Sequence, residues 1–207
     1  VDSELIPWWD EIAWMLKNTT KKAFCFGESG TVHLNGSTVD KVIRNFLTVI
    51  KTDPRPMDEK LLELKTKLGC AYNVNPRDKS LFVSWKQIKE MKSGGMAIGS
   101  HTCSHRILTH IDKENQLLEL GQSKQCLEQH LGCAIDSVAY PVGQRNTFNN
   151  DICEMTKQLG YKIGFSFTNT VNDLPIVNPY NVSRLGIDNH PSLMVLRQKI
   201  VLSGKSE

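Results

Sequence analysis

Hydrophobic residues recur every three or four positions through most of the first 80 residues, and this spacing is typical of helices with one buried face. It predicts one helix over residues 7–17 and another that begins at Ser37 or Thr38 and ends before Asp53. A third helix is predicted to end at Gly69, because glycine is the usual C-terminal cap. Four leucines are expected on its buried side: Leu61, Leu62, Leu64 and Leu68.

Between the first two helices the spacing changes to that of short strands. Residues 24–26 and 31–34 predict a β-hairpin, and the Glu-Ser-Gly sequence at 28–30 provides its turn. We therefore expect residues 1–80 to form a mostly helical lead-in, part of the same domain as the rest of the chain.

Beyond residue 80, short apolar strands alternate with amphipathic helices. Strands are predicted at 81–83, 96–99, 137–140, 163–167 and 181–187. Helices are predicted from Ser84 through Ile88 and Met91 to Gly94, from Asp112 through Leu117, Leu118 and Leu120 to Gly132, through Ile152 to Gly160, and over 193–202. Such alternation indicates parallel βαβ units. The expected fold class is α/β, with residues 81–207 forming part of a distorted, incomplete (β/α) barrel.

Composition excludes several classes of protein. A length of 207 residues with 40% hydrophobic content fits one domain, and a net charge of +3 without long basic runs argues against nucleic-acid binding. No apolar run reaches the roughly 18–20 residues of a membrane span. The six cysteines include no Cys-x-x-Cys pair, so we expect free thiols, which favour a reducing compartment.

Two histidines follow the strand predicted at 96–99. In a β/α barrel, side chains at the C-terminal end of a strand point into the site where the chemistry takes place. On a helical turn, His101 and His105 would lie on one face and both imidazoles could ligate one divalent ion, whereas Cys103 would face away. The alternative is a helix start with two solvated histidines.

The strand predicted at 137–140 ends in Tyr-Pro-Val-Gly at 140–143. A turn of this type brings backbone N–H groups close to whatever lies above the barrel. Such a donor can stabilise an oxyanion by about 3 kcal/mol. The alternative is a turn with no role beyond connecting a strand to a loop.

Taken in order, these motifs resemble a known family. The helix, strand and His-Thr-Cys-Ser-His sequence over 85–105 look like the second motif of NodB-homology polysaccharide deacetylases, carbohydrate esterase family 4. Residues 138–143 are similar to its third motif, in the Tyr-Pro-x-Gly form of one branch. The opening Pro-Trp-Trp-Asp at 7–10 resembles a helical insert of that branch. The resemblance covers about residues 1–204.

The resemblance implies that His101 and His105 ligate a divalent metal, most often zinc, and that Thr102 supports their loop. Val142 occupies the position whose backbone N–H holds the oxyanion, and Tyr140 would line the substrate groove. The implied reaction is hydrolysis of N-acetyl groups on a polysaccharide or oligosaccharide, by water that the ion acidifies.

The chain departs from the family pattern in its carboxylates. The family's first motif, Thr-Phe-Asp-Asp, supplies a third metal ligand and the base, yet no Asp-Asp pair occurs in this sequence. By its order in the family, the motif would fall just upstream of Val1, so we expect an N-terminally truncated chain, inactive as given, with unknown catalytic residues. Ala139 stands where many members have an arginine. His190 is the nearby candidate for the general acid, and the alternative is an exposed loop residue.

Other functions stay open at this point. A non-catalytic carbohydrate-binding remnant of the fold is the alternative to a deacetylase, and a structural zinc domain is disfavoured because no further ligand has closed-site spacing. An incomplete barrel would expose a sheet edge, so homodimerisation is a hypothesis. The location is unknown; a bacterial cytoplasm or cell envelope is expected, and the cysteines favour the cytoplasm.

Overall fold

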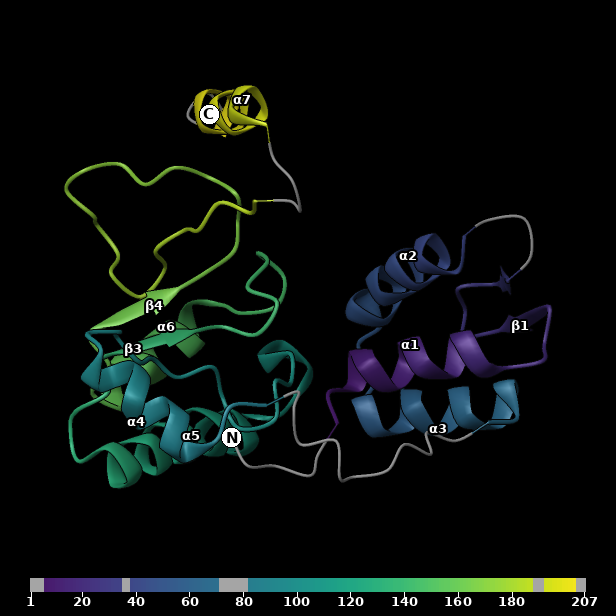
Figure 1. Cartoon of the computed structure of the whole chain (residues 1–207), viewed down its shortest axis with the longest axis horizontal. Helices are drawn as coiled ribbons and strands as arrows, with labels where there is room; N and C mark the ends of the chain where they lie inside the picture. Colours follow the sequence, from purple (N-terminus) through teal and green to yellow (C-terminus); the bar gives the residue numbers. More distant parts are fainter. Residues whose placement is uncertain (1–5, 35–37, 71–81, 188–191, 204–207) are drawn as a thin grey trace. The chain divides into compact units, whose positions relative to one another are not determined.

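The computed structural model describes residues 6–34, 38–70, 82–187 and 192–203. The chain divides into two compact units, Val1–Gln87 and Ile88–Glu207, and helix α4 (Trp85–Ser93) crosses the boundary between them (Figure 1). None of the helices in the described part of the chain has both the length and the hydrophobicity that crossing a bilayer requires.

Within its described residues, the first unit consists of three helices and a hairpin, as the hydrophobic spacing predicted. The hairpin pairs its strands antiparallel, with Phe24 opposite Val32. Thr38 is the N-cap of the second helix, while Ser37 lies outside the described residues. Its elements are α1 (Trp8–Asn18), β1 (Ala23–Cys25), β2 (Thr31–His33), α2 (Val39–Thr52) and α3 (Met57–Leu68).

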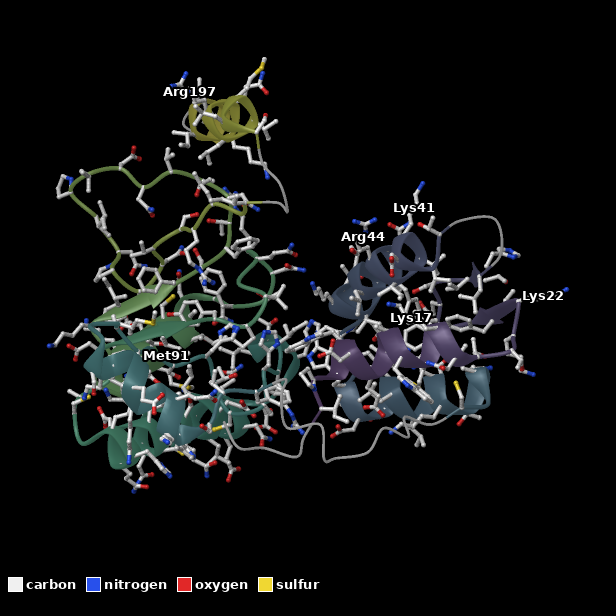
Figure 2. All side chains as sticks on the ribbon, in the orientation of Figure 1. Lys17, Lys22, Lys41, Arg44, Met91 and Arg197 are labelled. Carbon is white, nitrogen blue, oxygen red and sulfur yellow. The ribbon has the colours of Figure 1, made fainter. Side chains whose placement is uncertain are left out.

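Aromatic rings fill the centre of this unit. Phe46 of α2 lies edge-on to Phe24 and Phe26, with ring centroids 5.4 and 5.1 Å away. Ile12 of α1 and Ile50 of α2 pack into the same cluster and are fully buried. Lysine and arginine side chains occupy the opposite face of α2, as Lys41 and Arg44 show in Figure 2. The amphipathic pattern of α2 therefore determines which of its faces is buried.

The buried face of α3 differs from the prediction at one leucine. Leu64 and Leu68 are buried as expected, but Leu62 is 66% exposed and Lys60 is buried in its place. Positions 60, 64 and 68 lie along one stripe of a helix, and position 62 is half a turn away. The Lys60 ammonium donates to the carbonyls of Ile50 and Asp53, at 3.0 and 2.6 Å, and so satisfies acceptors at the end of α2.

The second unit carries the alternating elements. Helix α4 begins with a reciprocal cap, in which the Gln87 N–H donates to the Ser84 hydroxyl and the Ser84 N–H donates to the Gln87 side chain. Met91, expected on the apolar face of α4, is exposed (Figure 2). The remaining elements are a 3₁₀ turn η2 (Leu108–His110), α5 (Lys113–Leu131), β3 (Ser137–Ala139), α6 (Asn150–Gln158), β4 (Ile163–Phe165) and α7 (Leu193–Ser203).

Parallel pairing joins four segments of this unit side by side. Strands β3 and β4 pair in parallel, with Val138 opposite Gly164. Single parallel bridges add Ser100 beside Val138 and Val182 beside Phe165. The described residues thus form a short parallel array, and they do not close into a barrel. The α/β class is confirmed, whereas the full extent of the expected barrel is not found.

All five predicted strands are shorter than expected or absent. The strands predicted at 137–140 and 163–167 are reduced to β3 and β4. Residues 96–99 have no ladder among the described residues, and the strand predicted at 181–187 contributes only the bridge at Val182. Residues 82–83 are not a strand, and Leu81 lies outside the described residues. A strand forms only where a neighbour can satisfy its backbone hydrogen bonds. The Met96 N–H instead donates to the Met91 carbonyl at the end of α4, at 3.0 Å.

Helices α5 and α6 pack beside the two strands and make the core of this unit (Figure 1). Asp112 caps α5 by accepting from the Asn115 N–H at 2.8 Å, and Gly132 ends it in the left-handed conformation, as predicted. Leu120 is fully buried, but Leu117 and Leu118 are 47% and 44% exposed. The prediction for this pair was wrong because one apolar stripe suffices to bury the helix.

Candidate functional site

The two predicted histidines lie together at the end of the segment that is bridged to β3. Their ring centroids are 4.7 Å apart and the rings are nearly perpendicular. The segment 101–105 is not the predicted helical turn, because Thr102 and His105 both have left-handed backbone, with φ of 64° and 57°. The irregular loop nevertheless brings both imidazoles close enough to reach one ion about 2 Å from each ligating nitrogen.

A backbone contact fixes the tautomer of His101. Its Nδ1 lies 2.6 Å from the carbonyl oxygen of Ala139, which can only accept, so Nδ1 carries the proton and Nε2 keeps a free lone pair. Desolvation lowers the pKa of His101, and the nearby Arg184 lowers it further, although the bond to Ala139 acts in the opposite direction. His101 is therefore neutral at pH 7 and has the form that ligates metals.

Side-chain hydroxyls support the loop from within. Thr102 Oγ1 accepts from the His105 N–H at 3.2 Å, and Ser100 Oγ accepts from the Thr102 N–H at 3.4 Å. Between the histidines, Cys103 has its pKa raised to about 11 by desolvation and by the charge of Glu119. The thiol is therefore neutral in the metal-free chain.

Tyr140 does not line a groove as the resemblance implied. Its side chain is fully buried, stacks on Phe148 at 4.9 Å, and donates a hydrogen bond to the carbonyl of Tyr180 at 2.8 Å. Burial raises the pKa of its hydroxyl far above the ordinary value. The side chain points into the core because β3 alternates its faces, so Val138 and Tyr140 are buried together. Tyr140 therefore anchors the turn.

The turn after Tyr140 is notable for the backbone conformation and hydrogen bonding of Val142 and Gly143. Val142 has φ of 62°, which is rare for a β-branched residue, and its N–H donates no hydrogen bond within the described residues. Gly143 follows with φ of 69° and accepts from the Phe167 N–H at 2.7 Å. This contact joins the turn to the residues after β4. No described residue therefore competes for the Val142 N–H.

Replacing Val142 with glycine is expected to raise the free energy of unfolding by about 1 kcal/mol. Left-handed backbone costs a non-glycine residue about 1–3 kcal/mol, and the entropy of glycine offsets part of that gain. Urea denaturation can compare this variant with Val142→Ala, which keeps the strained conformation. Equal stability of the two variants would show that position 142 stores no strain.

A comparison with models of protein families shows which family the chain belongs to. The model for the polysaccharide deacetylase family matches residues 8–164, more than half of the chain. The chain belongs to the polysaccharide deacetylase family. The match includes the histidine loop and the turn at 140–143, so both predicted motifs lie within the region that the family shares.

Individual relatives of this polysaccharide deacetylase chain agree with the family assignment. YxkH of Bacillus subtilis, provisionally named a polysaccharide deacetylase, is 29% identical over 79 residues, which are 38% of this chain and 27% of YxkH. The structure of the Streptococcus pyogenes deacetylase PplD in complex with acetate is 27% identical and has a TM-score of 0.51, over 57% of this chain and 50% of PplD. BA0330 of Bacillus anthracis, also provisionally named a polysaccharide deacetylase, is 20% identical with a TM-score of 0.50, over 72% of this chain and 49% of BA0330, and supports the fold alone. The chain spans half or less of each of these proteins.

Sequence reasoning missed Arg184 as a site residue of this deacetylase chain. The Arg184 Nε–H donates to the Ser166 carbonyl at 3.0 Å, and the guanidinium lies 5.8 Å from the centroid of the Phe167 ring. Its charge is one of the causes that lower the pKa of His101. The one signal was position, since residue 184 follows the segment that is bridged to β4.

The two imidazoles suit a divalent ion that takes nitrogen ligands. Two imidazoles side by side, one of them with its Nδ1 held by a carbonyl, are an arrangement in which proteins hold zinc. Among the described residues no group of three His, Cys, Asp or Glu comes together. His190 lies outside the described residues, so its role as general acid stays a prediction.

A polar cavity lies between the loops that follow β3 and β4. Its volume is about 430 Å³. It lies at the carboxyl ends of the strands, where α/β folds bind their ligands. Amide, hydroxyl and guanidinium groups make up much of its lining, among them Arg145, Asn149, Asn150, Thr168, Asn181 and Ser183.

Proposed function

We propose that this chain carries two metal ligands and the oxyanion donor of a metal-dependent hydrolase that removes N-acetyl groups from a polysaccharide. The observation that supports it most is the bond from His101 Nδ1 to the Ala139 carbonyl, which leaves Nε2 free beside His105. Membership of the polysaccharide deacetylase family supplies the reaction class.

A divalent ion, proposed to be zinc, would acidify a water and polarise the acetyl carbonyl when bound. His101 and His105 would hold it, and the Ala139 carbonyl would keep the His101 ring in its ligating tautomer. The Val142 N–H would donate to the acetyl oxygen as negative charge develops there, and the strained turn holds that donor in place before the reaction begins.

The cavity between the loops after β3 and β4 suits a sugar chain. Amide and hydroxyl groups can exchange hydrogen bonds with sugar hydroxyls, and Phe148, Ile176 and Val177 add apolar surface. We propose that it holds part of the polysaccharide beside the acetylated unit. Dimerisation through a sheet edge, the cellular location and an upstream Asp-Asp motif stay predictions.

The chain as given is expected to bind an N-acetylated substrate without turning it over, because no Asp-Asp pair is present to supply the base. The test adds a chitin oligosaccharide and zinc to the purified chain and measures both acetate and amide chemical shifts. We expect shifts at Val142 and Gly143 and no more acetate than with the His101→Ala variant. Robust acetate release would refute the inactivity, and unmoved amide shifts would refute the substrate assignment.

The alternative is a non-catalytic carbohydrate-binding remnant. The polar cavity favours it, because binding a sugar chain needs the cavity but no base. The two proposals differ in their dependence on metal. A remnant would bind the oligosaccharide equally well with zinc or with a chelator, whereas a deacetylase site would bind it more tightly with zinc.

A further inference from the structure

A single carboxylate holds the backbone between the two histidines. One oxygen of Glu119, on α5, accepts from the N–H groups of Cys103 and Ser104, both at 2.9 Å. Its other oxygen accepts from the Ser104 hydroxyl. Hydrogen bonds to an ionised acceptor are roughly twice as strong as those between neutral groups. The turn that separates His101 from His105 is therefore fixed by three charge-assisted bonds from one side chain.

The same face of α5 makes a second contact with this loop. Ser123, one helical turn after Glu119, shares a 2.7 Å hydrogen bond with Ser100, the residue just before His101. Ser100 and Ser123 are both buried. Helix α5 thus holds the loop at its start and at its middle.

Helix α5 is itself rigidly placed, which makes it a suitable support. Its Leu120 is fully buried beside Val138, and the Leu120 carbonyl accepts from the Tyr161 hydroxyl at 2.9 Å. Glu119 is next to Leu120 in the sequence, so the packing of Leu120 also holds the backbone of Glu119 in place. Any movement of the turn would break its bonds.

The loop needs such a support because its backbone is unfavourable. Thr102 and His105 both have left-handed φ, a conformation that costs a non-glycine residue about 1–3 kcal/mol. Residues persist in it only where the surroundings impose it. Without Glu119, the turn would be free to relax towards ordinary φ values, and relaxation at either residue would rotate the imidazoles apart.

We propose that Glu119 is a positioning residue that holds His101 and His105 in their ligating arrangement, and this rests on the metal site of the proposed function. It does not touch the ion. It fixes the turn between the ligands, and its negative charge stands beside a loop that receives a cation. Outer-shell partners of this kind typically change metal affinity by about 10–100-fold.

Zinc titration of the full chain by calorimetry tests the proposal. Glu119→Ala is expected to weaken zinc binding by about 10–100-fold. Glu119→Gln, which keeps an acceptor without the charge, should lie between that variant and the wild type. The matched control is Glu114→Ala, which removes the same charge from the first turn of the same helix and should leave the affinity unchanged. Melting temperatures of the metal-free variants show whether each one is folded.

The outcomes separate this inference from the function on which it rests. Wild-type affinity in Glu119→Ala would overturn the positioning role alone, as would equal losses in the Glu114 and Glu119 variants. A wild-type chain that binds no zinc would overturn the metal site and the positioning role together. If Glu119→Ala fails to fold, the decision falls to Glu119→Gln, for which wild-type affinity overturns the proposal and an intermediate affinity supports it.

Discussion

A chain in which His101 and His105 are both alanine is expected to lose zinc binding, with an affinity more than about 100-fold weaker than that of the wild type. This loss of affinity exceeds the 10–100-fold loss, roughly, that follows removal of a residue supporting a ligand, because here the ligands themselves are removed. The free energy of unfolding should change little, because neither histidine belongs to the hydrophobic core of this unit. Calorimetric titration with zinc measures the loss.

His33→Ala is the matched control for this experiment. His33 is an exposed histidine at the end of β2, in the first unit, and its removal should leave the affinity unchanged. Single substitutions at His101 and His105 should each give most of the loss, because one imidazole alone holds zinc weakly. Undiminished binding by the double variant would place the zinc elsewhere, with the free cysteines as the first alternative.

Gly143→Ala is expected to lower the free energy of unfolding by about 3 kcal/mol or more. A Cβ at this position would lie 2.8 Å from the backbone nitrogen of Phe167 and 3.1 Å from its Cβ. The neighbour cannot move away, because the Phe167 N–H donates to the Gly143 carbonyl. The left-handed φ of 69° adds about 1 kcal/mol or more. Urea denaturation followed by circular dichroism measures the change.

Gly132→Ala is the control that separates the cost of left-handed backbone from the cost of a steric clash. Gly132 has nearly the same φ, 64°, but nothing lies within 4 Å of the position that its Cβ would occupy. This variant should lose only about 1 kcal/mol, the cost of left-handed backbone without glycine. Similar losses in the two variants would mean that the turn at 140–143 and the segment after β4 are not packed as the structure has them.

Features set by neighbours in the sequence could be predicted. The hairpin between residues 24 and 34, the cap at Asp112 and the glycine ends of α3 and α5 all depend on side chains within a few positions of each other. The pairing of His101 with His105 was also predictable, although for a different reason from the one the pattern suggested. A strained loop, and not a helical turn, brings the rings together.

Features set by distant contacts could not be predicted. Lys60 is buried because two carbonyls at the end of α2 accept from it, and no periodicity shows that. Tyr140 was expected in a groove, but the alternation of β3 places it in the core. Glu119 binds the histidine loop from a later helix, and Arg184 acts on His101 through its charge, so only the folded chain reveals them. Strands such as 96–99 depend on partners, which a local pattern does not specify.

Anomalous diffraction at the zinc edge, from crystals of the zinc-loaded chain, tests the proposed metal site most directly. We expect one strong peak within bonding distance of His101 Nε2 and of a ring nitrogen of His105, with His101 Nδ1 still bonded to the Ala139 carbonyl. A peak bound through Nδ1 of His101, or a peak at other residues with none at this pair, would contradict the proposed site.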